Sequence, residues 1–307
     1  MTTRNRAKLL GKTLDSVLPQ MTDEVEIVII DGASTDETED VVRGFLEKHP
    51  SLHYYRKNTN SGVDRDYNAS IEAARGEYCW FISDDDLIKP GALRRILELA
   101  EKGYSAIVVN AEDWNADFTV PLGKNRLPFA VDRVYQPQEF DQLFIDTVHH
   151  LSFIPALVIR RDIWVSRERE KYFGSWFTHV GVVFQSPLPS DTFLVAAPLV
   201  AIRNENISWV GRMFEIWMIR WPDLIWSFPH FSDSLKEMIC PKNPSMDWRA
   251  LLAYRAKGAY TFKEYKQHIL PRTTDIKFRL LAALVSVIPP SFINTLSFIY
   301  RNNLAKR

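Results

Sequence analysis

Three consecutive carboxylates, Asp84, Asp85 and Asp86, are the residues of this chain that most directly suggest chemistry. Two carboxylates about 5 Å apart repel each other by roughly 1 kcal/mol even at the dielectric constant of water. No Lys or Arg lies closer in the sequence than Lys89. A hard cation such as Mg²⁺ or Mn²⁺ would offset the repulsion, and Mg²⁺ commonly binds one or two carboxylates together with substrate phosphates. The triplet therefore predicts a metal–diphosphate site, and the alternative is a solvated turn whose carboxylates cap the next helix.

The elements around the triplet predict where it lies. It follows a strand expected at 77–82, and a further carboxylate, Asp31, follows a strand expected at 25–30. Helical spacing marks the segments 9–18, 41–49, 63–75 and 90–103, and a capping box from Ser34 to Glu37 predicts the start of the second helix. Alternation of strands and helices predicts an α/β fold, with a mainly parallel sheet flanked by helices. Ligands bind beyond the carboxyl ends of such strands, where Asp31 and the triplet are expected to meet.

Composition excludes several classes of protein. The 307 residues carry 38 Lys and Arg against 38 Asp and Glu, which argues against nucleic-acid binding through bulk electrostatics. Cys79 and Cys240 form neither a disulfide framework nor a metal-ligand spacing, which indicates a reducing compartment. No signal peptide opens the sequence, and the longest apolar run, 280–288, is too short to span a bilayer. We therefore expect a cytoplasmic protein.

Three segments resemble family 2 glycosyltransferases of the GT-A fold. VIIDGASTD at 28–36 is similar to the family's VxDGGSTDGT segment. SGVDRDYNASIEAARG at 61–76 resembles its GxxDAxNxGIxxAxGE helix, and WFISDDDLIKPGA at 80–92 resembles FLDxDDxxxPGAL, which includes the DxD metal motif. The three segments follow in the family's order, each on the expected element. The resemblance covers roughly residues 3–110.

The resemblance implies a role for each matching carboxylate. Asp31 would accept a hydrogen bond from the nucleotide base, and Asp66 would contact the base or ribose. Asp85 and Asp86 would hold the ribose and the metal, with Asp84 completing the DxD motif; which of the three binds the metal stays open. The alternatives are a strand-end turn residue for Asp31 and, for Asp66, a first-turn residue favoured by the helix dipole.

Two features depart from the family pattern. The chain starts at Met1 and matches only the end of a PTYNR-like turn, so we expect the family's first strand to be absent, because the true start lies upstream or the sheet is incomplete. The acidic pair that usually supplies the catalytic base is not found in the second half. His179 is proposed as the base, because a neutral imidazole can take a proton near neutral pH. Asp191 is the second choice, and the alternative for His179 is a histidine without chemistry.

The later segments predict an acceptor side and a membrane side. Arg203 follows a strand-like run, where its fork of donors would bind phosphate unless it is a surface residue. We expect residues 1–110 to form the nucleotide-sugar half of a GT-A domain, 111–210 its acceptor half, and 211–307 a helical region rich in aromatic residues. Apolar segments flanked by basic residues in 276–307 are typical of an interfacial anchor. The alternative is a helix pair that docks on the main domain or on a second subunit.

These observations favour one function over two others. We expect an inverting, metal-dependent glycosyltransferase that moves a sugar from a nucleotide-diphospho-sugar to a saccharide acceptor, lipid-linked and on the cytoplasmic face of the inner membrane. The later region is loosely similar to bacterial O-antigen transferases of the abequosyltransferase type. A sugar nucleotidyltransferase is the second hypothesis, although no Gly-rich phosphate loop lies near the start. The third is a non-catalytic, membrane-associated scaffold protein.

Overall fold

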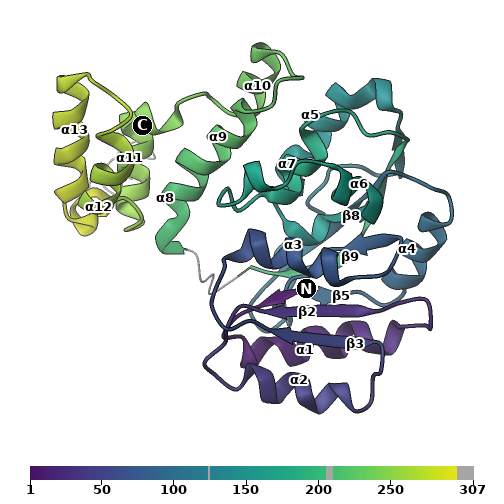
Figure 1. Ribbon diagram of the computed structural model, residues 1–307. Coiled ribbons are helices and arrows are strands. Elements are labelled where there is room, and N and C mark those ends of the chain that lie inside the picture. The colour runs from purple at the N-terminus through teal and green to yellow at the C-terminus, as the bar shows by residue number, and fades with distance from the viewer. Residues whose placement is uncertain (124, 205–209, 296–307) are drawn as a thin grey trace. The chain divides into compact units, whose positions relative to one another are not determined.

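The computed structural model describes residues 1–123, 125–204 and 210–295 (Figure 1). The chain divides into two compact units, Met1–Asn206 and Ile207–Arg307. Each unit has its own hydrophobic core, and each is described by itself.

A three-stranded parallel sheet begins the first unit. It has the order β1 (Thr2–Thr3), β2 (Ile27–Asp31), β3 (Leu52–Arg56). All residues of β2 are buried, as expected for a central parallel strand. The expectation that the first strand is absent is wrong in part, because Thr2 and Thr3 pair with Ile30 and Asp31.

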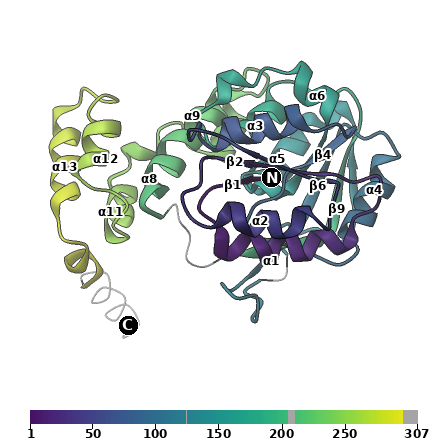
Figure 2. The same ribbon diagram turned by 60° about the horizontal axis from the view of Figure 1, so that its bottom comes forward.

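Helices cover both faces of this sheet. α3 (Val63–Ala73) lies on one face, while α1 (Ala7–Val17) and α2 (Thr38–Leu46) lie on the other (Figure 1). Figure 2 shows α1 and α2 side by side. The short helix η1 (Leu18–Gln20), with a proline in its first turn, follows α1. Apolar residues at helical spacing on α1 and on α4 (Ala92–Ala100) join the same core, which explains why these helices form where the spacing predicts them.

The second sheet of this unit is mixed. Its order is β4 (Tyr78–Trp80), β8 (Leu157–Arg160), β6 (Ala106–Trp114), β9 (Thr192–Arg203), β5 (Leu87–Ile88), with β7 (Arg133–Tyr135) also paired to β9. Strands β6 and β9 run parallel, and the other pairs are antiparallel. The remaining helices of the unit are η2 (Pro137–Glu139), α5 (Phe140–Leu151), η3 (Ile154–Ala156), α6 (Arg161–Ser166), η4 (Glu170–Tyr172) and α7 (Thr178–Phe184).

The second unit is helical, with an aromatic core. Its elements are η5 (Val210–Arg212), α8 (Met213–Glu215), η6 (Ile216–Arg220), α9 (Trp221–Trp226), α10 (Asp233–Ile239), η7 (Pro244–Met246), α11 (Trp248–Ala256), α12 (Phe262–Glu264), η8 (Tyr265–Ile269) and α13 (Ile276–Val287). The rings of Phe214 and Tyr260 lie 4.7 Å apart in this core, and those of Trp217 and Trp221 are 5.8 Å apart, as their spacing of four predicts. Within the described residues, no helix has the length and hydropathy needed to cross a bilayer.

The predicted capping box is wrong. α2 begins at Thr38, and its N-cap residue, Glu37, makes no side-chain cap. The Ser34 hydroxyl instead accepts a hydrogen bond from the Asn5 N–H at 2.9 Å, and Asp36 accepts from the Thr38 N–H at 3.1 Å. A tertiary contact with residues near the N-terminus therefore takes the hydroxyl that the local pattern assigns to the helix.

Asp64 ties α3 to a loop that is distant in sequence. Its carboxylate accepts hydrogen bonds from the backbone N–H groups of Gly174 (2.8 Å), Trp176 (2.9 Å) and Thr178 (3.3 Å). The residue is only 7% exposed, and its burial raises the pKa of the carboxyl. One side chain thus supplies the acceptor for three loop donors, and the loop leads directly into α7.

Replacement of Asp64 by alanine is expected to destabilise the chain by about 3 kcal/mol. Each of the three loop N–H groups would lose its acceptor, which costs about 1–3 kcal/mol for a buried donor, and hydrogen bonds to water would recover part of this cost. This corresponds to a fall in Tm of roughly 6–10 °C. Asp64→Asn, which keeps one acceptor oxygen, should lose about half as much. Glu98→Ala, at a side chain 54% exposed, is the control and should leave Tm within about 1 °C. Equal Tm values for Asp64→Ala and Glu98→Ala would contradict the role of Asp64.

Candidate active site

Residues 3–6 connect the two acidic segments. Thr3 lies opposite Asp31 in the β1–β2 pairing, and its carbonyl accepts a hydrogen bond from the Gly32 N–H at 2.9 Å. Three residues later, the Arg6 guanidinium lies 3.6 Å from Asp84 and 3.9 Å from Asp85. The structure therefore brings the carboxyl end of β2 and the acidic triplet together, as the alternation of strands and helices predicts, although β2 and β4 belong to different sheets.

Asp84 and Asp85 share a crowded, negatively charged position. Burial, and then the charge of Asp85, raise the pKa of Asp84 to about 7, while Arg6 and Thr3 act in the opposite direction. Burial also raises the pKa of Asp85, against the opposing charges of Arg6 and Arg203. The nearby guanidinium groups thus offset only part of the cost of burying these carboxylates in their charged form. Two adjacent buried carboxylates fit a divalent cation that completes its coordination with phosphate oxygens and water. No cluster of three or more potential metal ligands occurs among the described residues.

Asp86 has a different environment from its two neighbours. It is 3% exposed, and its Oδ1 accepts a hydrogen bond from the Arg203 N–H at 2.8 Å, while Ser83 Oγ donates to its Oδ2. Its backbone carbonyl accepts from Thr13 Oγ1 at 2.8 Å. Both carboxylate oxygens are engaged within the protein, so this side chain fastens the end of β9 to the triplet.

Arg203 is positioned by that contact. It is the last residue of β9, and its Nε donates to the carbonyl of Ala116 at 3.1 Å. Its positive charge lowers the pKa of Asp85, against the larger effect of burial. A guanidinium in this place can attract an anionic group that binds beside the triplet.

Asp31 organises the turn after β2. It is fully buried; its Oδ1 accepts a hydrogen bond from the Ser34 N–H at 2.8 Å, and its Oδ2 accepts one from the Tyr54 hydroxyl at 2.5 Å. The same turn is joined to the N-terminal segment, because the Arg6 N–H donates to Thr38 Oγ1 at 2.9 Å. Asp31 therefore fixes the shape of this part of the site.

Asp66 borders the same turn. Its Oδ1 accepts hydrogen bonds from Lys57 Nζ and Ser61 Oγ, both at 2.6 Å, and the residue is 4% exposed. A Cβ atom built on Gly32 would lie 2.8 Å from Asp66 Oδ2, so a larger residue at this position would displace that carboxylate. The structure thus brings Asp31, Asp66 and the triplet around one region.

Three residues of this region were missed by the sequence reasoning. They are Arg6, Tyr54 and Lys57, which respectively contact Asp84, Asp31 and Asp66. Lys57 directly follows β3, so the strand-end rule that found Asp31 could have found it. No local pattern marks Tyr54, whose hydroxyl reaches Asp31 only through the pairing of β2 with β3.

The structure does not support His179 as the base. The ring lies on α7, is 4% exposed and packs near Phe81, with its Nε2 within 2.7 Å of the Leu151 carbonyl. Burial lowers its pKa to about 4. A general base must reach the acceptor hydroxyl with a pKa near the working pH, and these contacts are those of a packing histidine.

The second choice, Asp191, lies at the wrong end of the sheet. It precedes Thr192, which pairs with Ala106 at the start of β6, whereas Arg203 pairs with Trp114 at its other end. Eight residue steps along β6 separate the two positions, roughly 26 Å at about 3.3 Å per residue. Asp86 is bonded to the Arg203 end, so Asp191 is distant from the triplet.

The family follows from the match to known proteins. The model for glycosyl transferase family 2 matches residues 1–163, more than half of the chain. The chain belongs to this family. The segment that carries the match includes Asp31, Asp66 and the triplet, the carboxylates that the structure gathers.

Two relatives agree with this family 2 assignment. Abequosyltransferase RfbV of Salmonella typhimurium is 24% identical over 220 residues, 67% of this chain and 66% of the relative. The GalNAc(5)-diNAcBac-PP-undecaprenol beta-1,3-glucosyltransferase of Campylobacter jejuni is 31% identical over 109 residues, 35% of each chain. The chain thus spans less than two thirds of each relative's length.

The crystal structure of S. aureus TarS 1–349 in complex with UDP-GlcNAc matches with a TM-score of 0.58 at 13% identity, over 92% of this chain and 77% of that one. The complex of the same protein with UDP gives a TM-score of 0.57 at 15% identity, over 98% and 90% of the two chains. The resemblance to family 2 and the GT-A fold are therefore confirmed.

The chain without metal is expected to lose stability from this site as the pH rises from 4 to 7. Burial and Asp85 raise the pKa of Asp84 from 3.8 to about 7, so over this range the folded state keeps a proton that the unfolded state has released. Asp85→Asn removes the neighbouring charge and should be about 1–2 kcal/mol more stable than wild type at pH 7, with little difference at pH 4. Urea unfolding in EDTA measures the difference, with Glu98→Gln as the control. A difference in the free energy of unfolding between Asp85→Asn and wild type that is the same at pH 4 and pH 7 would contradict the effect of Asp85 on the pKa of Asp84.

Proposed function

We propose that this family 2 chain is an inverting glycosyltransferase that moves a sugar from a nucleotide-diphospho-sugar to a saccharide acceptor. The observation that carries the proposal is the convergence of Asp84 and Asp85 with the Asp31 turn, joined through residues 3–6. Such a site combines a fixed turn able to hold a nucleoside with carboxylates that suit a metal-bound diphosphate. The family assignment and the transferases among the relatives support the same activity.

We assign different parts of the donor to different residues of the site. The turn held by Asp31, with Asp66 beside Gly32, is assigned to the nucleoside. Asp84 and Asp85 are assigned to Mg²⁺ or Mn²⁺, which would neutralise charge on the departing diphosphate. Arg203 is placed to attract the phosphates, and Asp86 positions that arginine. Residues 1–110 then form the donor side, 111–210 the acceptor side, and 211–307 the helical region.

The acceptor is proposed to be a saccharide on a lipid carrier, in the synthesis of cell-surface polysaccharide. The Campylobacter relative is named for an undecaprenol-linked substrate, and the Salmonella relative is an abequosyltransferase. A lipid-linked acceptor lies at a membrane, so the enzyme must reach that surface. We propose a peripheral location on the cytoplasmic face.

The surface of α13 supports this location. Ile276, Leu280, Leu284 and Val287 follow one another at spacings of four, four and three, and are 57–69% exposed. They form an apolar stripe opposite the face that buries Ala282 and Val285 in the core of the unit. Residues 207–307 carry 15 Lys and Arg against 7 Asp and Glu, a formal net charge of +8. An apolar helix face on a basic unit fits an anionic lipid surface. The part of the expected anchor at 296–307 lies outside the described residues.

Replacement of either Asp84 or Asp85 should strongly reduce the rate of sugar transfer. Asp85→Asn and Asp84→Asn are expected to lower the rate at least 100-fold, because each removes a carboxylate from the metal and diphosphate site. The measurement is Mn²⁺-dependent release of nucleoside diphosphate from a panel of nucleotide sugars, with Glu98→Gln as the surface control. Wild-type rates in both variants would contradict the proposed metal site.

The same assay separates the alternative functions. Pyrophosphate in place of nucleoside diphosphate would indicate the sugar nucleotidyltransferase. A chain that binds no nucleotide in the presence of Mn²⁺ would indicate the scaffold protein. Calorimetric titration with UDP, TDP and CDP makes the second comparison without the acceptor.

Disruption of the apolar stripe should release the chain from membranes. The double variant Leu280→Glu, Leu284→Glu is expected to bind vesicles rich in phosphatidylglycerol at least tenfold more weakly, because it places two charges at the apolar contact. Met238→Glu, at an apolar residue that is 74% exposed on α10, is the matched control and should bind like wild type. Unchanged sedimentation of the double variant with vesicles would refute the contact.

A further inference from the structure

The acceptor hydroxyl must lose a proton during an inverting transfer, and neither His179 nor Asp191 is placed to take it. A base must lie within about 3 Å of the acceptor oxygen, which itself approaches the anomeric carbon to about 3 Å. The donor sugar therefore lies between the base and the carboxylates that are assigned to the diphosphate. We expect the base on a strand next to the acidic triplet, at the same end of the sheet.

The strands next to the triplet carry only two acidic side chains. Asp86 leads directly into β5, which pairs with β9, and β9 pairs in turn with β6 (Figure 2). Strands β5 and β9 contain no Asp or Glu, whereas β6 contains Glu112 and Asp113. Leu87, Ala201 and Glu112 form one row across the three strands. At about 4.8 Å per strand, Glu112 lies roughly 10 Å from Leu87 along this row.

Glu112 and Asp113 lie on opposite faces of the sheet. Ile202 of β9 belongs to the hydrophobic core of the unit, and it pairs with Asp113. Paired residues share a face of a sheet, and successive residues of a strand point to opposite faces. Asp113 therefore lies on the core face, where its carboxylate is 3.7 Å from the Arg126 guanidinium. Glu112 lies on the other face.

The face of Glu112 is also the face of Arg203. Arg203 pairs with Trp114, which is two residues after Glu112 and on the same side of β6. The Arg203 N–H donates to Asp86 at 2.8 Å. Burial raises the pKa of Asp85, and the charge of Arg203 opposes this effect. The contacts of Arg203 thus connect the face that carries Glu112 with the triplet.

The Glu112 carboxylate is held at one oxygen. Its Oε1 accepts hydrogen bonds from Lys89 Nζ at 2.9 Å and from Trp114 Nε1 at 3.0 Å. Both hydrogen bonds that the described residues make to this carboxylate go to Oε1, which leaves Oε2 for a ligand. The side chain is 14% exposed, so it is fixed in place without being sealed from solvent.

We propose that Glu112 is the catalytic base, and that its Oε2 takes the proton of the acceptor hydroxyl. The oxygen of this hydroxyl forms a bond to the anomeric carbon while the bond from that carbon to the diphosphate breaks. Nucleoside diphosphate leaves with the electron pair, and Glu112 then passes the proton to water. Lys89 and Trp114 position the carboxylate for this step. The proposal rests on the proposed transferase function.

Replacement of Glu112 should lower the rate of the chemical step and leave donor binding intact. Glu112→Gln keeps an acceptor oxygen for Lys89 and Trp114 but cannot take the proton, so kcat should fall by about 10²–10⁴-fold. Glu112→Asp withdraws the carboxylate by about 1 Å and should cost about 10–100-fold. The measurement is Mn²⁺-dependent release of nucleoside diphosphate from a panel of nucleotide sugars, with water and methyl glycosides as acceptors.

Two comparisons separate a base from a residue that only maintains structure. The KM for the nucleotide sugar and the calorimetric affinity for UDP, TDP or CDP should stay within twofold in Glu112→Gln, which also shows that the variant is folded. Asp113→Asn is the matched control, because it changes the next residue on the opposite face, and it should keep the wild-type kcat.

Azide provides a nucleophile that needs no base. Because azide is already negatively charged, it should attack the anomeric carbon in Glu112→Gln and raise the release of nucleoside diphosphate at least tenfold. The product should be a glycosyl azide of inverted configuration. Asp85→Asn, which lacks a carboxylate of the diphosphate site, should show no such rescue.

Several results would overturn the assignment of Glu112 while the wild type remains an active transferase. They are a kcat of Glu112→Gln within threefold of wild type, a loss of kcat matched by a loss of nucleotide affinity, an equal loss in Asp113→Asn, and no rescue by azide. A wild-type chain that releases no nucleoside diphosphate from any donor would overturn the proposed function and the base together.

Discussion

The pairing of β1 with β2 is the interaction on which the candidate site depends. Backbone bonds of 2.9–3.0 Å join Met1 to Val28, Ile30 to Met1 and Gly32 to Thr3. They hold the first residues along the carboxyl half of β2, so that Arg6 reaches both Asp84 and Asp85. Together with the hydrogen bonds from the Asn5 N–H to Ser34 and from the Arg6 N–H to Thr38, this short ladder joins the segment that carries Arg6 to the Asp31 turn. Two residues of strand thus set the geometry of two motifs that lie more than fifty residues apart.

Charge is distributed unevenly in this neutral chain. Residues 207–307 carry a formal +8, so residues 1–206 carry −8. An acidic first unit repels a diphosphate, which must therefore be met by local positive charge. Arg6 and Arg203 supply part of it beside Asp85, while burial raises the pKa of all three carboxyls of the triplet and the charge of Asp85 adds to this at Asp84 and Asp86. A divalent cation is the ligand that resolves both repulsions at once, because it attracts the carboxylates and the phosphates together.

The sequence allowed individual helices and strands to be predicted, but it did not reveal the contacts between residues that are distant in the chain. The helix at Ala7–Val17 and the strand at Ile27–Asp31 follow from periodicity, because each buries one face or its whole length in the same core. Ser34 was assigned to a helix cap, yet Asn5 takes its hydroxyl. The interpretation of His179 as the base is not supported for a related reason. Its place in the sequence does not reveal that its ring forms a hydrogen bond with the Leu151 carbonyl. Asp191 could not be placed before the register of β6 and β9 was known.

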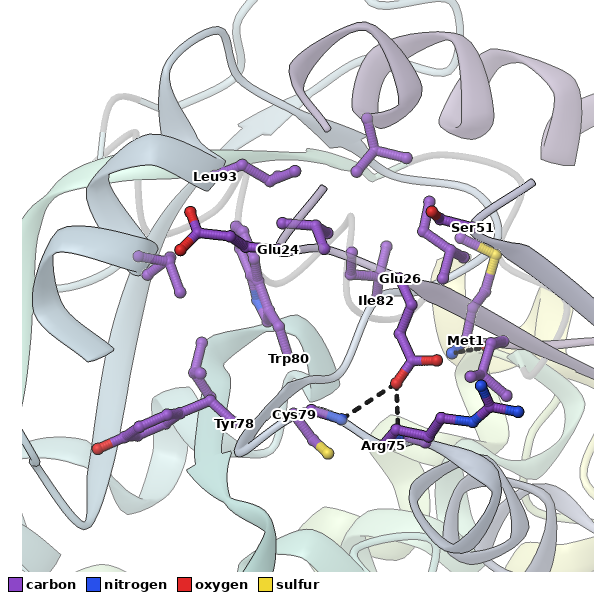
Figure 3. A pocket seen from close by; sticks show the side chains of 18 of the residues that line it. Met1, Glu24, Glu26, Ser51, Arg75, Tyr78, Cys79, Trp80, Ile82 and Leu93 are labelled. Carbon is purple, nitrogen blue, oxygen red and sulfur yellow. Dashed lines mark hydrogen bonds between the residues drawn. The ribbon is translucent and has the colours of Figure 1, made fainter. Parts of the chain in front are cut away.

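Strand continuity and site geometry are physically linked in this unit. Met1 lines the cavity shown in Figure 3, and five residues further along the chain Arg6 lies beside the acidic triplet. A strand of two residues fixes few backbone angles and has few bonds to hold its register, whereas each added pair strengthens the ladder and removes freedom from the residues beyond it. The position of the Arg6 guanidinium at the triplet therefore depends on how firmly the preceding backbone is paired with β2.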